Sequence, residues 1–296
     1  MKVPADLLDR RLVVVMGKGG VGRTTVAAAL GLVAARRGRR PIVCEMCGRA
    51  RVDETGVDLA TISVDPEEAK LEWLERQLRS RRLARLLGRN RIFELLTAAA
   101  PGLAELVAIG KVWDLAQLGS RARGDHDVVI LDAPATGQGL ALLDAPATYV
   151  KVARAGPIHG QASRIAAFLR DPSSTAILAV ALPEEMPVNE TLELEDRLRE
   201  RALCLEAVIV NGVFPGRFSA DEAKRLEDLN GRLTPGARAA LATALGEHRR
   251  GRAQRAQLRR LRRRAGTPVS TLPFLFEPEL GSRHIEVLSR RLEAAL

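Results

Sequence analysis

Short apolar segments rich in β-branched residues recur along the chain between longer stretches of mixed polarity. Such segments are typical of strands that are buried on both faces of a parallel sheet. They predict strands at residues 12–16, 41–45, 61–64, 127–131, 175–182, 207–210 and 267–275. Strands that alternate with helices predict an α/β fold with a doubly wound, mainly parallel sheet and helices on both faces.

Two longer stretches have the pattern of helices. The first covers residues 66–120 and is interrupted at Gly88 and at Pro101-Gly102, and the second covers residues 219–265. We expect a single domain over residues 1–296 in which these two stretches are helical subdomain segments, the first of them inserted into the α/β fold.

A glycine-rich loop lies between the first predicted strand and a helix expected over residues 24–37. Glycines let successive backbone N–H groups turn toward a phosphate, and the helix N-terminus adds partial positive charge. The loop fits the phosphate-binding pattern G-x-x-x-x-G-K-[ST] except that arginine replaces the lysine. The residues expected to bind the nucleotide are Gly17, Gly19, Gly20, Val21, Gly22, Arg23, Thr24 and Thr25.

A second motif agrees with a nucleotide site. Val128-Val129-Ile130-Leu131-Asp132 is an apolar strand that ends in an acid. In phosphate-loop NTPases such an acid lies beside the first strand and holds Mg²⁺, usually through water. We therefore predict that the chain binds ATP, with Thr24 and Asp132 as the residues that hold Mg²⁺.

With Lys18 at its second position, the loop resembles the deviant Walker A motif of the MinD/ParA/ArsA group of dimeric ATPases. Within that group, residues 132–138 (DAPATGQ) resemble the second switch of the ArsA-type anion-pump ATPases and of the ATPases that target tail-anchored membrane proteins. Residues 101–105 (PGLAE) resemble part of that family's helical subdomain. Glu190-Thr191, Val210-Asn211 and Leu272-Pro273 follow in the family's order.

The resemblance implies the P-loop NTPase fold and a set of roles. Lys18 would reach across a dimer interface to the partner's nucleotide, residues 136–138 would sense the γ-phosphate, and Asn211 would contact the adenine. Lys18, Asp132 and Asp53 are the candidate catalytic residues, the last as the nearest match to the aspartate that orients the attacking water.

Three departures from the family pattern lead us to expect slow hydrolysis. Arg23 keeps the charge of the usual lysine but is planar and larger. Gln138 stands where the family commonly has histidine, and the family's first switch is not recognisable in residues 44–54.

The charge of the chain is concentrated in one segment. The net charge is +10, but nine arginines and no acid lie between His248 and Arg264, so the rest of the chain carries only +1. A solvated helix face explains this run as well as a binding surface does.

Cysteine content and the N-terminus favour a cytoplasmic protein. Three cysteines, Cys44, Cys47 and Cys204, are too few for a disulfide framework. The C-x-x-C spacing of Cys44 and Cys47 occurs in zinc sites, but scattered histidines supply no further ligands, and a structural role is expected. Residues 1–11 lack the order of a secretory signal, and no apolar stretch approaches the ~20 residues of a transmembrane helix.

Two classes of function remain open. The first is an ArsA-like dimeric ATPase, a homodimer or a heterodimer with a paralogue, that controls a hydrophobic client helix or a membrane partner. Apolar residues between Leu71 and Leu96 would line the client groove or close the subdomain's own core. The second is a ParA-like partition ATPase that uses the arginine run on DNA. The second switch favours the first class, so nucleic acid is not the expected partner. A non-hydrolysing nucleotide-binding subunit is a further alternative.

Overall fold

The computed structural model describes residue 4 and residues 6–46, 51–65, 69, 102–118, 126–229 and 233–296. The apolar residues between Leu71 and Leu96, together with Gly88, Pro101 and Cys47, lie outside this part of the chain. Of the first helical stretch the structure describes mainly its end, residues 102–118.

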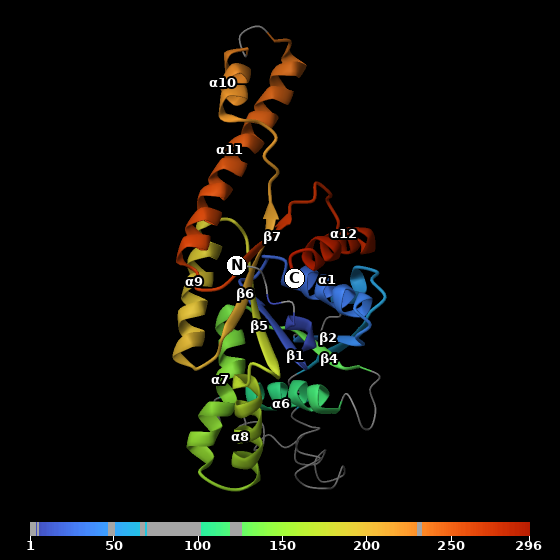
Figure 1. The fold of residues 1–296 in the computed structure, drawn as a ribbon, viewed down its shortest axis with the longest axis vertical. Coiled ribbons are helices and arrows are strands. Elements are labelled where there is room, and N and C mark those ends of the chain that lie inside the picture. Colours follow the sequence, from blue (N-terminus) through green and yellow to red (C-terminus); the bar gives the residue numbers. More distant parts are fainter. Residues whose placement is uncertain are drawn as a thin grey trace, which may run out of the picture.

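Seven parallel strands form one sheet in the order β3-β2-β4-β1-β5-β6-β7 (Figure 1). They are β1 (Leu12–Gly17), β2 (Pro41–Met46), β3 (Ala60–Val64), β4 (Val128–Asp132), β5 (Thr175–Ala181), β6 (Leu205–Val213) and β7 (Val269–Pro273). On one side of β1 lie β4, β2 and β3, and on the other side lie β5, β6 and β7, so the predicted doubly wound parallel sheet is confirmed.

Helices cover both faces of the sheet (Figure 1). One layer contains η1 (Leu7–Asp9), α1 (Arg23–Arg36), α2 (Arg51–Glu54) and α12 (Ser282–Glu293). The other contains α6 (Leu103–Leu118), α7 (Thr136–Ala153), α8 (Pro157–Arg170) and α9 (Glu185–Glu200).

The central strand shows why its sequence has no polar position. Val13 and Val15 pack in the layer of α1, whereas Leu12, Val14 and Met16 pack in the layer of α7 and α9. Each face of β1 is therefore fully buried, and an apolar residue is favoured at every position.

The second helical stretch forms α10 (Ala220–Asp228) and the thirty-residue α11 (Pro235–Arg264). Ser219 and Glu222 form a capping box at the start of α10, and Thr234 caps α11. The C-terminal half of α11 packs along α9 and β6, and its N-terminal half extends past the sheet with α10 (Figure 1). In that view α6 lies near the opposite end of the molecule, against α7, α8 and β4.

Candidate functional site

The glycine loop joins β1 to α1 and needs glycine at two positions. Gly17 has φ +150°, and a Cβ atom there would collide with the carbonyl group of Val180. Gly22 has φ +91°, and a Cβ atom there would collide with the side-chain amide of Asn211. Gly22 is also the N-cap of α1, and no described side chain caps this helix. The first N–H groups of α1 are therefore available to an anion.

Thr24 and Asp132 meet at the start of α1. The Thr24 hydroxyl group donates a hydrogen bond to Asp132 Oδ2 at 2.5 Å. Asp132 ends β4, next to β1, and is only 8% exposed. A hydroxyl group and a carboxylate are the hard oxygen donors that Mg²⁺ prefers, so the pair fits the predicted metal site.

Arg23 is bound back toward the second switch. Its guanidinium group donates a hydrogen bond to the carbonyl oxygen of Ala133, the residue after Asp132. The Ala133 N–H group in turn donates to Val15 at 3.1 Å. The arginine at the lysine position thus links the loop to the segment that leads into α7.

Lys18 lies on the other side of the loop and contacts α9. Its Nζ atom is 2.6 Å from Glu190 Oε1. A cavity of about 360 Å³ lies beside this pair, lined by Lys18, Gly19, Ala135, Thr136, Gly137, Glu190, Glu193, Leu194 and Arg197. The structure therefore brings the loop lysine close to residues 135–137 of the predicted second switch.

Asn211 also belongs to the loop region. It lies near the end of β6, and its side-chain amide donates a hydrogen bond to the Val21 carbonyl group at 3.0 Å. This contact joins residues 190 positions apart in the sequence.

Of the two acids Asp53 and Glu45, only Glu45 lies beside Asp132 on the adjacent strand. Asp53 is exposed on α2, and its carboxylate accepts a hydrogen bond from Thr61 in β3 at 2.8 Å. Glu45 is 4% exposed, near the end of β2, and pairs in register with Asp132 on the adjacent strand. Its Oε1 atom accepts a hydrogen bond from the Val52 N–H group at 3.2 Å. Sequence analysis missed Glu45, although the strand predicted at residues 41–45 ends at this acid.

Gln138 lies near the N-terminal end of α6. It lines a mainly apolar cavity of about 270 Å³ together with Met46, Ala104, Glu105, Ala108, Pro134 and Leu142. The end of the second switch and the base of α6 therefore share one hollow.

Cys44 is unsuited to metal binding. It lies inside β2 with no exposed surface, and burial raises the pKa of its thiol to about 12. A zinc ligand must lose this proton.

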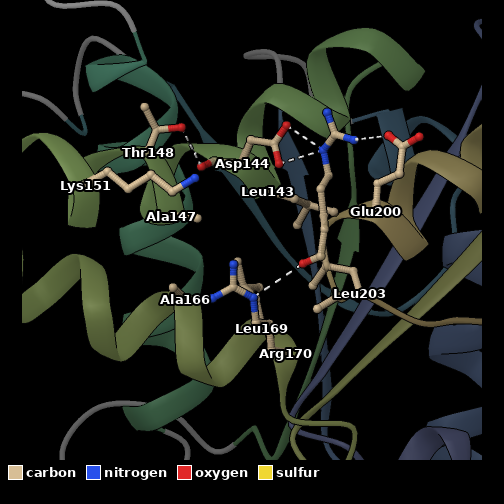
Figure 2. A pocket seen from close by; sticks show the side chains of 12 residues that line it. Leu143, Asp144, Ala147, Thr148, Lys151, Ala166, Leu169, Arg170, Glu200 and Leu203 are labelled. Atoms are coloured by element: carbon tan, nitrogen blue, oxygen red, sulfur yellow. Dashed lines mark hydrogen bonds and ion pairs between the residues drawn. The ribbon is translucent and has the colours of Figure 1, made fainter.

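A third cavity, of about 520 Å³, lies between α7, α8 and the end of α9 (Figure 2). There Arg201 Nε lies 2.7 Å from both carboxylate oxygens of Asp144, which ties the end of α9 to α7. Residues 200–203 in its lining come just before β6, so the cavity lies at the end of the strands opposite to the glycine loop. None of the predicted site residues lines it.

A sequence model of the anion-transporting ATPases matches residues 10–46, 49–156 and 157–231. The chain belongs to this family. Its similarity to the ATPase BagA of Mycobacterium tuberculosis is 32% identity over 244 residues, which covers 76% of this chain and 72% of BagA. The family and this relative, which is itself named an ATPase, identify the chain as an ATPase.

Other relatives in the family are more distant. The ATPase GET3C of Arabidopsis thaliana is 24% identical over 268 residues, covering 70% of this chain and 68% of the relative. An arsenical pump-driving ATPase of Escherichia coli is 28% identical over 210 residues, covering 69% of this chain but only 35% of the pump ATPase. None of the helices in the described ranges combines the length and apolar character of a membrane span.

Proposed function

We propose that this anion-transporting ATPase family member binds Mg²⁺-ATP at residues 17–25 and works as a dimer. Opening and closing of the dimer would control a hydrophobic client or a membrane partner. The observation that supports the site is the Thr24–Asp132 hydrogen bond at 2.5 Å beside the uncapped start of α1. It brings N–H groups that can donate hydrogen bonds to phosphate close to oxygen atoms that can bind a metal ion.

Phosphate binding follows from the loop itself. The backbone N–H groups from Gly19 to Thr25 would surround the phosphates, and Arg23 adds charge-assisted hydrogen bonds. Thr24 would bind Mg²⁺ directly and Asp132 through water. When bound, Mg²⁺ neutralises part of the charge on the β- and γ-phosphates.

Hydrolysis would depend on positioning and on charge neutralisation. Lys18 would leave Glu190 and contact the phosphates of the nucleotide in the partner subunit. Residues 136–138 would respond to the γ-phosphate, since Thr136 and Gly137 line the cavity beside Lys18. Arg23, Gln138 and the exposed position of Asp53 support slow turnover.

The apolar cavity around Gln138 supports a link between nucleotide and client. It lies between the second switch and α6, so a movement of the switch would displace the N-terminal end of α6. A hydrophobic client helix is the partner that such a segment would bind.

The contact between Arg23 and Ala133 also supports a second candidate function. An arginine held by the protein itself can keep nucleotide bound while contributing little to hydrolysis. The chain would then act as a nucleotide-binding subunit that pairs with a more active paralogue.

Two measurements on the purified full-length chain test the proposal. Calorimetry should detect ATP binding that requires Mg²⁺ and is lost in Thr24→Ala, with Thr148→Ala on α7 as a matched control. Sedimentation with a non-hydrolysable ATP analogue should reveal a dimer. Binding that is the same without Mg²⁺, or a monomer at all nucleotide concentrations, would contradict the corresponding half of the proposal.

A further inference from the structure

Helix α11 carries all nine arginines of the acid-free run, and the structure divides them into groups. Two serve the fold. Arg260 donates a hydrogen bond to Asn189 of α9 at 2.6 Å, and Arg250 lies 3.7 Å from Glu184 and over the ring of Phe214. These arginines face the elements on which α11 packs.

Five others are exposed on one side of the helix, which we call the arginine face: Arg249, Arg252, Arg259, Arg262 and Arg263. At 100° per residue they fall within a sector of about 140°. The buried positions Gln254, Leu258 and Leu261 lie outside this sector. Of the remaining two arginines, Arg255 is half-buried and Arg264 is exposed outside this sector. All five arginines are exposed, and nothing in the described chain forms an ion pair or a side-chain hydrogen bond with them.

This absence of paired acids distinguishes α11 from other helices of the protein. On α9, Arg199 lies 2.8 Å from Asp196, and on α12, Arg290 lies 3.1 Å from Glu286. On the arginine face, by contrast, like charges stand three or four residues apart, as in Arg259 with Arg262 and Arg263. Such pairs of like charges destabilise a helix. A bound polyanion would remove this repulsion.

We propose that the arginine face binds the phosphodiester backbone of nucleic acid without sequence preference. Guanidinium groups form bidentate hydrogen bonds with phosphate. From Arg249 to Arg263 the row extends about 21 Å along a straight helix, which fits a linear array of phosphates.

The composition of the same face argues against a bilayer. The exposed residue Ala256 lies among its arginines. None of the large exposed apolar side chains of the described chain lies on α11. A membrane surface would therefore gain no apolar insertion from this helix.

The test is fluorescence anisotropy with a labelled duplex of ~20 base pairs, about two helical turns. The protein is kept saturated with Mg²⁺-ATP, so that the glycine loop is occupied. Five phosphate contacts predict that affinity falls roughly 500-fold between about 50 and 200 mM salt. The triple variant Arg252→Gln, Arg259→Gln, Arg263→Gln should make the slope of log K against log salt shallower by about 2.7.

A matched control removes the same charge from another helix. Arg283→Gln, Arg290→Gln, Arg291→Gln changes three exposed arginines of α12 and should leave the slope unchanged. The corresponding lysine triple on α11 should retain the salt dependence, which separates a charge effect from misfolding.

Three outcomes would overturn the proposal. They are no duplex binding at about 50 mM salt, an equal loss in the α12 control, or binding to phosphatidylglycerol vesicles but not to the duplex.

Discussion

Lys18 Nζ lies 2.6 Å from Glu190 Oε1, so the loop lysine is held within its own chain. The two side chains are 39% and 32% exposed. An ion pair with this much exposure contributes about 0–1 kcal/mol to stability. Lys18 can therefore exchange Glu190 for a phosphate group at small cost, as a role across a dimer interface requires.

The first prediction concerns the charge of Glu190. Glu190→Gln should favour the nucleotide-bound dimer, because Lys18 no longer leaves a carboxylate when it moves. The dissociation constant of the dimer should fall by up to about fivefold, equivalent to ~1 kcal/mol. Sedimentation with a non-hydrolysable ATP analogue measures it.

Glu193→Gln is the control for that experiment. Glu193 lines the same cavity but pairs with Arg197 instead of Lys18. It should leave dimerisation unchanged. A weaker dimer in Glu190→Gln would mean that Glu190 positions Lys18 for its task.

The second prediction concerns Lys18 itself. A residue that stabilises charge developing in the transition state affects the rate more than ground-state binding. Lys18→Ala should therefore lower kcat by a larger factor than it lowers ATP affinity. Steady-state kinetics and calorimetry on the same preparation measure both factors. Equal factors would assign Lys18 to ordinary nucleotide binding.

The third prediction concerns the contact between Gly22 and Asn211. In Gly22→Ala, the new methyl group meets the Asn211 amide while φ stays in the left-handed region, at a cost of about 1–3 kcal/mol. ATP affinity should fall about tenfold or more. Adding Asn211→Ala removes the clash and should restore affinity in part, since the backbone strain and the loss of the adenine contact expected of Asn211 then remain.

Gly160→Ala supplies the comparison, because a Cβ atom at that position of α8 contacts nothing within 4 Å. It should bind ATP like the parent protein. Full recovery in the Gly22→Ala, Asn211→Ala double variant would show that backbone strain at Gly22 is negligible and that Asn211 does not contribute to ATP affinity.

Local sequence was enough to predict the strands and the loop. A strand buried on both faces demands an uninterrupted apolar run, and β1 and β4 have one. The four glycines of the loop lie within six consecutive residues, 17–22, so their motif can be recognised without the fold. The helices α7, α8 and α9, which cover one face of the sheet, were harder to predict from the sequence, because they depend on packing against the sheet.

The side-chain contacts of the site could not be predicted from spacing. Lys18 and Glu190 are 172 positions apart, and Asn211 contacts the loop from the sixth strand. The family pattern calls for an aspartate at this point, and Asp53 matches it better than Glu45 does. Only the register of β2 against β4 reveals that Glu45 lies beside Asp132.

The fourth prediction follows from that register. Glu45→Gln should raise the Mg²⁺ concentration needed for ATP binding by about tenfold, the low end of effects from residues that support metal ligands. The amide oxygen can still accept the hydrogen bond from Val52, so the fold should persist. Calorimetry across a Mg²⁺ series measures the shift.

Asp53→Asn is the discriminating control for Glu45. Asp53 binds Thr61 in β3, and its substitution should leave the Mg²⁺ requirement unchanged. The reverse pattern, with Asp53→Asn raising the requirement and Glu45→Gln without effect, would assign the support of Mg²⁺ to Asp53 instead of Glu45.

The last prediction concerns Arg23, where the chain departs most clearly from the family loop. Its guanidinium group is engaged with the Ala133 carbonyl group, beside the second switch. A planar fork suits phosphate binding as well as an ammonium group does. It is less able to follow the oxygens of the γ-phosphoryl group while the bond to the leaving group lengthens.

Arg23→Lys should therefore keep ATP affinity within about an order of magnitude, or ~1.4 kcal/mol, and raise the hydrolysis rate. The ammonium group of lysine is more compact than the planar guanidinium group, so it can follow the moving phosphoryl oxygens. Single-turnover hydrolysis measures the chemical step apart from product release. A rate that falls or stays the same would make Arg23 an equivalent of lysine, and slow turnover would then have to come from Gln138 or from the altered first switch.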